Sequence, residues 1–445
     1  MIYKNRLLET ISYKVDAVTV SPLSIKEDEG NLKTDDVTGR FYIPGSSIAG
    51  AFRNYYETHI CGNSGSDKNV LFGSTDIGMN RLVCYDAFPA DTSIKRMVAS
   101  RPGLKIDRRR LTEYHFSVMG NEAGSKFRRY FINDGIRFSF EFDLNNYDKD
   151  YDFGTVQKDF ERLLAAFAAG DILLGSNKTV GFGRFKIISV HKDSYNLREY
   201  RDVLRYLLKK EEYEDITEAV INNNSLSKKV RFKITGKTVT PLLIKDEAVR
   251  LSGEPDGVNI KTGEGKYVIP GSSLKGVIRT RAEKIVNTFP RLESSIITDI
   301  FGVEADKDTE GRISRFVCYD TVINNSKTGL YNKIKIDYFT GGVKNAALGT
   351  EETVMGDLEI ECVFNTYGLK QYDKEIGLLL LVFRDLCTGN MNVGGGYAVG
   401  RGYIKADRLE VIDVEKGDRM VYDFETPDRF VEEKFNSYIS KLMVG

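Results

Sequence analysis

The sequence contains four groups of short motifs twice, in the same order. Each second copy follows the first at a spacing of roughly 220–235 residues. The pairs are IPGSSIAGAFR at 43–53 with IPGSSLKGVIR at 269–279, LFG and RLVCYD at 71–73 and 81–86 with IFG and RFVCYD at 300–302 and 315–320, KIDRRR at 105–110 with KIDYFT at 335–340, and LLGSNKTVGFGRFKI at 173–187 with NVGGGYAVGRGYI at 392–404. Such colinear matches predict a duplicated domain, and a function that uses two similar modules in tandem.

The repeat fixes the expected domain boundaries. A chain of 445 residues is long enough for two domains with a core each. We expect a first domain at 1–195, a helical and polar linker at 196–225, a second domain at 226–415 and a short C-terminal tail at 416–445. No apolar run reaches the ~18 residues of a membrane span, and the first residues lack the apolar core of a signal peptide. These features predict a cytoplasmic protein.

The five cysteines form no CxxC pair, which argues against a zinc cluster. Cys84 and Cys318 occupy the same place in the two repeats, inside apolar runs. We therefore expect them to be small buried hydrophobic residues. An odd, unpatterned set of cysteines is also typical of a reducing compartment.

Each repeat has the same order of predicted elements: strand, helix, strand, charged insertion, strand, helix and a closing strand after a glycine-rich loop. Alternating apolar residues predict the opening strands at 13–23 and 230–244. The order is approximately β-α-β-β-α-β, so the expected fold class is α+β, with two tandem ferredoxin-like domains that carry hairpin insertions. The same layout underlies RNA-recognition modules, whose open sheet face binds single strands.

Charge is balanced over the whole chain but not locally. The 64 basic and 64 acidic residues give a formal net charge of zero, which argues against a protein that coats nucleic acid by bulk charge. Residues 95–130, however, contain ten Lys or Arg and three acidic residues, with aromatic residues between them. Arg108, Arg109 and Arg110 are the densest part of this run and are candidates for RNA contacts. The alternative is a solvated basic surface.

The IPGSS motif predicts a strand that turns into a helix. Free backbone amides at a helix start, with the helix dipole behind them, can bind a phosphate group, and serine is a good N-cap residue. The candidate phosphate ligands are Gly45, Ser46, Ser47 and Arg53 in the first repeat and Gly271, Ser272, Ser273, Lys275 and Arg279 in the second. Ala49 replaces the lysine in the first repeat, so we expect weaker binding there. The alternative is a helix that is merely well capped.

A glycine-rich loop precedes the last strand of each repeat. Glycines leave little side-chain bulk, so a ligand backbone can approach the loop closely. The candidate RNA contacts in these loops are Gly394, Gly396, Gly400, Arg401 and Gly402 in the second repeat and Lys178, Gly181 and Gly183 in the first. The nucleotide-binding pattern GxxxxGK followed by Ser or Thr is absent, which argues against ATP or GTP chemistry.

These motifs resemble the RAMP superfamily of CRISPR effector complexes, and within it the backbone subunit of type III complexes. That subunit carries IPGSSLKG, an FG with a following strand, a KIDR-type start to a protruding hairpin and a terminal glycine-rich loop, in this order. All four occur twice here, so the chain resembles a tandem duplication of that subunit. The resemblance implies binding to a guide crRNA paired with a complementary target RNA, beside other RAMP and large-subunit proteins of the complex.

The resemblance also implies two hairpins and a cutting residue. The "thumb" hairpins, which kink the guide–target duplex, would be about residues 105–135 and 335–356. In the family, an aspartate that cuts target RNA lies fourteen or fifteen residues before the proline of IPGSSLKG, and this count leads to Asp256. In the first repeat the count finds no aspartate, so Asp28 and Glu29 are weaker candidates.

An aspartate suits this chemistry because RNA supplies its own nucleophile, the 2′-OH beside the scissile phosphate. A carboxylate can accept the proton of that hydroxyl or hold a divalent metal ion, here Mg²⁺ or Mn²⁺ at Asp256. Three alternatives stay open: Asp256 as the turn residue of Pro-Asp-Gly, a scaffold that binds guide RNA and cuts nothing, and a ribonuclease that processes guide precursors with a histidine. None of the three histidines recurs in both repeats.

Overall fold

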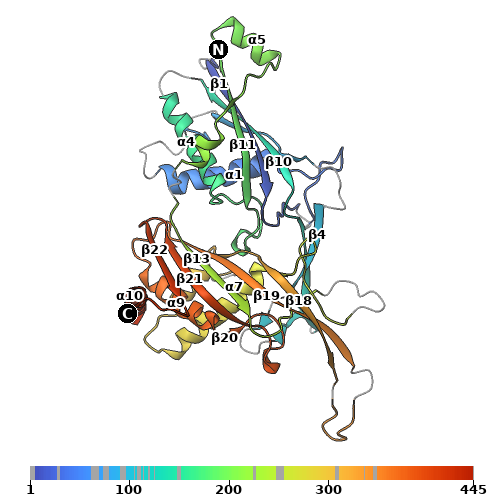
Figure 1. The fold of residues 1–445 in the computed structure, drawn as a ribbon. Helices are drawn as coiled ribbons and strands as arrows, with labels where there is room; N and C mark the ends of the chain where they lie inside the picture. The colour runs from blue at the N-terminus through green and yellow to red at the C-terminus, as the bar shows by residue number, and fades with distance from the viewer. Residues whose placement is uncertain are drawn as a thin grey trace. The chain divides into compact units, whose positions relative to one another are not determined.

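The computed structural model describes residues 6–27, 31–61, 70–73, 80–90, 97–104, 106–107, 112–113, 115–118, 121–124, 126–147, 152–223, 227–246, 255–305, 310–334, 336–343 and 348–443. Five candidate residues lie outside them: Asp28, Glu29, Arg108, Arg109 and Arg110. The chain forms two compact units (Figure 1). The first comprises Met1–Val98, Phe131–Lys178 and Phe182–Lys228, and the second comprises Ala99–Tyr130, Thr179–Gly181 and Lys229–Gly445.

The first unit is built on an antiparallel sheet with the order β12-β11-β1-β10-β2, and β3 also pairs with β10. The strands are β1 (Glu9–Thr19), β2 (Leu82–Cys84), β3 (Phe88–Pro89), β10 (Arg137–Asn146), β11 (Phe185–Asn196) and β12 (Glu214–Asp215). Buried residues alternate along β1 and β10, as expected for strands with one face on a core. The predicted alternation at 13–23 therefore belongs to a central strand.

Helices α1 (Gly45–Tyr55) and α4 (Phe153–Ala168) contribute buried residues to the same core as this sheet. Phenylalanines dominate the contact, and Phe167 lies 5.5 Å from both Phe140 and Phe185 between ring centroids. The first unit also contains the helices η1 (Tyr56–Ile60), which continues α1, and α5 (Tyr200–Leu207) and α6 (Thr217–Ile221), which follow β11. Burial of large aromatic rings is the main stabilising contribution here.

The second unit repeats this arrangement, and its β19 has 17 residues where the equivalent β10 has 10. Its antiparallel sheet has the order β16-β18-β19-β13-β21-β20, with β17 paired to β19 and β22 paired to β21. The strands are β13 (Lys229–Thr238), β16 (Val268–Ile269), β17 (Phe316–Cys318), β18 (Thr321–Lys333), β19 (Gly349–Asn365), β20 (Thr388–Asn392), β21 (Tyr403–Asp413) and β22 (Asp418–Asp423). The four strands β21-β13-β19-β17 correspond in order to β11-β1-β10-β2.

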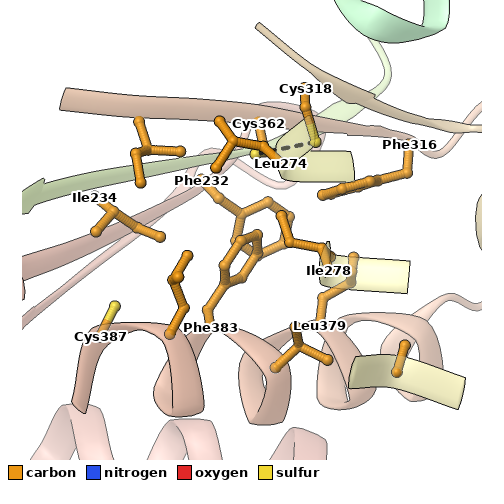
Figure 2. Packing of buried hydrophobic residues seen from close by; sticks show 14 of the residues in the cluster. Phe232, Ile234, Leu274, Ile278, Phe316, Cys318, Cys362, Leu379, Phe383 and Cys387 are labelled. Carbon is orange, nitrogen blue, oxygen red and sulfur yellow. Dashed lines mark hydrogen bonds between the residues drawn. The ribbon is translucent and has the colours of Figure 1, made fainter. Parts of the chain in front are cut away.

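Helices α7 (Gly271–Thr288), α8 (Ser295–Phe301) and α9 (Asp373–Cys387) pack on this sheet. Figure 2 shows Phe232 of β13 and Phe383 of α9 facing each other, with ring centroids 4.8 Å apart. In the same core the Cys362 thiol donates to the Cys318 sulfur over 3.6 Å. Both cysteines are free and fully buried, so the prediction of a small hydrophobic core residue is confirmed for Cys318. Cys84 is only partly buried, against the core of the first unit.

The C-terminal tail is part of the second unit. Helix α10 (Arg429–Met443) packs against α9, and its Tyr438 and Leu442 belong to the core. Gly377 of α9 permits this contact, because a β-carbon at that position would lie 2.5 Å from the Tyr438 carbonyl oxygen. The apolar run at 377–383 is buried within α9.

Each repeat carries an inserted hairpin before its third main strand. In the first repeat, β4 (Val98–Leu104) pairs with β9 (Lys126–Ile132), and β5 (Ile106–Asp107), β6 (Thr112–Glu113), β7 (His115–Val118) and β8 (Asn121–Gly124) lie between them. In the second repeat, β18 and β19 extend as a long hairpin beyond the rest of their unit (Figure 1). Side chains in the outer half of β18 are mostly exposed.

The structure thus mixes helices with antiparallel sheets, and the two repeats share their order of main elements. This much of the expected fold class is confirmed. In the described part of the chain, no helix has both the length and the apolar character needed to cross a membrane.

Candidate nucleic-acid interface

Asp256 lies in a short segment that is fixed to the start of β19. The Thr350 amide donates to the Asp256 carboxylate over 2.8 Å, and the Gly257 amide donates to the Thr350 carbonyl oxygen over 3.1 Å. The Glu352 amide donates in return to the Gly257 carbonyl oxygen over 2.7 Å. These bonds anchor the Pro-Asp-Gly turn, yet the Asp256 side chain is exposed. The carboxylate is therefore held in place and open to solvent.

Two short strands attach this segment to the second unit. Strand β14 (Lys245–Asp246) pairs with β15 (Val258–Asn259). Only Gly257 separates Asp256 from the start of β15. The buried Asn259 side chain accepts a hydrogen bond from the Ile244 amide (2.8 Å) and donates to the Glu352 carbonyl oxygen (2.9 Å). This amide links β14, β15 and β19, and it brings Lys245 close to the start of β19.

Glu351, at the start of β19, forms ion pairs with three basic side chains. Its carboxylate pairs with Lys245 Nζ at 3.0 Å, Lys333 Nζ at 2.6 Å and Arg401 Nη1 at 2.5 Å. We call these four residues the Glu351 cluster. Three cations and one carboxylate leave it with a net charge of +2. The Glu351 side chain is 4% exposed, whereas Lys245 and Lys333 are each 48% exposed.

The pairing changes the acidity of the carboxyl group. Burial by itself raises the pKa of Glu351, but hydrogen bonds from Lys333, Lys245 and Arg401 outweigh burial and lower the pKa to about 2. Glu351 is therefore ionised at any physiological pH. The Arg401 guanidinium also lies 4.9 Å from the centre of the Tyr331 ring, so its position is fixed from two sides.

The glycine-rich loop positions Arg401. Gly400 and Gly402 flank the arginine with φ of +75° and +79°, a conformation that other residues adopt at a cost. A β-carbon on Gly402 would lie 2.0 Å from the Val393 carbonyl oxygen, and in the first repeat a β-carbon on Gly183 would lie 1.9 Å from Leu174. These two glycines thus serve close backbone packing. Gly175, Gly181, Gly394 and Gly396 of the two loops also have positive φ.

Sequence reasoning found Asp256 and Arg401 but missed Glu351, Lys245 and Lys333. A signal for Lys245 was present, because Ile-Lys-acid recurs at 25–27 and 244–246. Glu351 had no such signal. The position that corresponds to Glu351 follows from two equivalent isolated bridges, Leu23–Ile132 in the first repeat and Leu242–Val354 in the second. Glu351 lies three residues before Val354, and Arg129 lies three residues before Ile132.

The helix starts are arranged differently from the serine caps that we expected. The N-cap residues are Pro44 and Pro270, which form no side-chain capping hydrogen bond, so the expectation that Ser272 or Ser273 would be the N-cap is wrong. The first helical amides instead donate to aspartates of the VCYD motifs, Gly45 to Asp86 (2.7 Å) and Gly271 to Asp320 (2.8 Å).

Glycine is required at both helix starts for packing. A β-carbon on Gly271 would lie 2.2 Å from the Cys318 carbonyl oxygen, and one on Gly45 would lie 2.1 Å from that of Cys84. Asp320 also accepts a hydrogen bond from Arg101 within the second unit. A phosphate approaching the Gly271 amide would therefore meet a carboxylate. Phosphate binding at Ser46, Ser47, Ser272 and Ser273, which follow in the first turn, stays a prediction.

The basic candidates near these helices have partners of their own. Arg53 pairs with Glu57 at 2.8 Å and Arg279 pairs with Glu283 at 3.0 Å, one turn along each helix. Lys275 Nζ donates to the Thr179 carbonyl oxygen over 3.2 Å, and burial lowers the pKa of Lys275 to about 8. Burial also lowers the pKa of Lys178, which begins the 3-10 helix η2 (Lys178–Val180). Both lysines are thus partly desolvated.

Metal ligands are sparse around Asp256. Within the residues that the structure describes, no three His, Cys, Asp or Glu side chains gather in a way that could hold a metal ion. Mg²⁺ needs fewer protein ligands than that, because it keeps several waters and often binds one or two carboxylates together with phosphate oxygens. The exposed carboxylate of Asp256 fits such a role, with RNA supplying the other ligands.

Comparison with known proteins gives one family. The model of the RAMP superfamily matches residues 16–186 and 235–405, which covers most of both repeats. No curated protein matches the chain. Among solved structures, a chain in a cryo-EM structure of the Type III-B Cmr-beta bound to cognate target RNA is similar, with 17% sequence identity and a TM-score of 0.31. The match covers 42% of this chain and 61% of that chain.

Proposed function

The chain belongs to the RAMP superfamily, and from this premise we propose that it is a subunit of a type III CRISPR effector complex that binds guide crRNA and cuts complementary target RNA. The double match of the family model supports a tandem duplication of the guide-binding backbone subunit. Its partners would be the guide crRNA, the target RNA and the other RAMP and large-subunit proteins of the complex, in the cytoplasm.

The sheet order supports the ferredoxin-like part of this proposal. In both units the first main strand lies between the third and the fourth, and the second lies outside the third. This is the order expected of a β-α-β-β-α-β domain that closes an antiparallel sheet. Such sheets offer a surface on which single-stranded RNA can bind.

One observation carries the assignment of cleavage: the exposed carboxylate of Asp256 is anchored beside the positively charged Glu351 cluster. When a target phosphate lies there, its neighbouring 2′-oxygen can attack phosphorus while the 5′-oxygen leaves. Asp256 accepts the proton of the 2′-hydroxyl, a contribution of roughly 10²–10⁴-fold. If Mg²⁺ or Mn²⁺ takes part, Asp256 would hold it, and the ion would supply charge stabilisation on the phosphate oxygens.

The rival proposal is a scaffold that binds RNA and cuts nothing. The hydrogen bond from Thr350 to Asp256 favours it, because this carboxylate already has a structural task in the turn. The third possibility, a ribonuclease for guide precursors, would need a histidine. His59 stacks on Tyr55 with ring centroids 4.1 Å apart, and His191 lies in β11 beside Tyr213. Both contacts suit a structural role.

The test compares Asp256→Asn with wild type in the complete complex. Asparagine can still accept the Thr350 hydrogen bond, so the turn is preserved. We expect target cleavage to fall at least about 100-fold while the amount of guide RNA that copurifies is unchanged. Asp423→Asn is the matched control, because Asp423 also accepts backbone hydrogen bonds, from Glu425 and Thr426. Unchanged cleavage at the same positions in Asp256→Asn would favour the scaffold.

A further inference from the structure

The Glu351 cluster has more positive charge than its own carboxylate can neutralise. Lys245 pairs with one oxygen of Glu351, and Lys333 and Arg401 share the other. One buried carboxylate needs only one cation, and each additional cation costs desolvation and side-chain entropy. Both lysines nevertheless keep about half of their side-chain surface in solvent. A net charge of +2 at an accessible surface attracts an anion.

The cluster lies next to the residue that the proposed function uses. A β-carbon built on Gly257 would lie 3.1 Å from Lys245 Cε, 3.5 Å from Lys245 Nζ and 3.3 Å from Glu351 Cγ. Gly257 immediately follows Asp256 in the chain. The Lys245 ammonium group therefore lies beside the residue that follows Asp256.

We propose that Lys245, Lys333 and Arg401 form a binding site for one phosphodiester of the target RNA, and that Glu351 is the positioning residue that holds the three cations together. The proposal rests on the proposed function for the identity of the RNA, but not for the chemistry of the anion. Arg401 contributes a fixed, planar donor set, because Glu351 and the Tyr331 ring hold its guanidinium. The two lysines contribute mobile point charges that can follow the phosphate.

The first repeat supports a functional origin for the cluster. Lys26 is the counterpart of Lys245, but Arg129 stands in place of Glu351 and Phe182 in place of Arg401. Phe182 packs on Phe131 with ring centroids 5.5 Å apart, so an apolar contact occupies that position. The first repeat folds without the cluster, hence the fold itself does not require it.

The proposal is tested by the salt dependence of RNA binding to the full chain, with a labelled single-stranded RNA as the probe. The variant is Lys245→Gln with Lys333→Gln, which removes both charges and keeps most of the aliphatic packing. The logarithm of the binding constant should fall less steeply with the logarithm of the salt concentration, by about 0.7 for each RNA phosphate that the variant no longer neutralises. Asp256→Asn should keep the wild-type slope.

A matched control is Lys233→Gln with Lys416→Gln. These lysines are 46% and 43% exposed and also pair with carboxylates, Glu359 and Asp373, within the same unit. The salt dependence of RNA binding in this control variant should have the same slope as in wild type. The proposal is overturned if the slope of the salt dependence decreases equally in both double variants, or if it does not decrease in the variant of Lys245 and Lys333. If the binding of inorganic phosphate, followed by ³¹P NMR line width, depends on Lys245 and Lys333 while the RNA slope does not, the site binds free phosphate and its assignment to RNA is wrong.

Glu351→Gln separates positioning from simple attraction. The substitution raises the charge of the cluster, so a site that only attracts RNA should bind it at least as tightly and cut it at least as fast. If Glu351 positions the cations, the Glu351→Gln variant should instead cut more slowly: kcat falls while KM does not rise. The slope measurement needs no cleavage. A wild-type complex that cuts nothing, together with a flatter slope in the lysine variant, would refute the nuclease and keep the anion site.

Discussion

Glu351 stays ionised in the folded protein far below the pH at which an ordinary glutamate takes up a proton. Burial raises the pKa of Glu351, but its three cationic partners lower it to about 2, from an ordinary value of 4.5. Because the folded-state pKa is the lower one, the ionised carboxylate stabilises the fold above about pH 4.5. This contribution is lost as the pH falls from about 4.5 to about 2.

We therefore predict that Glu351→Gln lowers the free energy of unfolding at neutral pH by about 3 kcal/mol, and that the difference from wild type shrinks as the pH falls through this window. Urea denaturation at a series of pH values measures both quantities. Glu359→Gln is the control, because Glu359 forms an exposed ion pair with Lys233 that contributes less than about 1 kcal/mol. A difference that does not depend on pH would contradict the role of the three cations.

Among the elements, the glycine-rich loop before β21 contains two glycines with similar backbone angles and different surroundings. Gly400 has φ of +75° and open space where a β-carbon would lie, whereas Gly402 has φ of +79° and the Val393 carbonyl oxygen 2.0 Å from that point. An alanine at either position carries the left-handed backbone cost of about 1–2 kcal/mol. Only at Gly402 must the backbone also move.

We predict that Gly400→Ala destabilises the second unit by about 1–2 kcal/mol and Gly402→Ala by roughly 3–5 kcal/mol. Chemical denaturation, followed by circular dichroism, measures the two losses. Because the backbone next to Arg401 must move only in the Gly402 variant, that variant should also weaken RNA binding, while Gly400→Ala should bind normally. Equal losses of stability would mean that the loop backbone relaxes freely and does not fix the arginine.

For the whole molecule, the duplication made the order of elements predictable from sequence, since every motif could be read twice. The helix start at IPGSS was predicted, but its cap was not. Asp86 and Asp320 follow β2 and β17, and they lie 41 and 49 residues along the chain from Gly45 and Gly271. The Glu351 cluster was missed for the same reason. Its four residues come together only when β14, β18, β19 and the glycine loop pack, and no local pattern in the sequence encodes that.

The two repeats are unequal in the feature that accompanies Asp256, the proposed cutting residue. Arg129 and Phe182 replace Glu351 and Arg401 in the first repeat, so this repeat lacks the buried carboxylate and the arginine of the cluster. We predict that each bound copy of the chain cuts its target once. Asp28→Ala with Glu29→Ala should leave the set of labelled fragments unchanged, because the first repeat does not carry the glutamate and arginine of the cluster. Asp256→Asn should remove every cut made by this chain. Two cuts per copy, one of them absent in the Asp28 and Glu29 variant, would mean that a carboxylate cuts without the cluster.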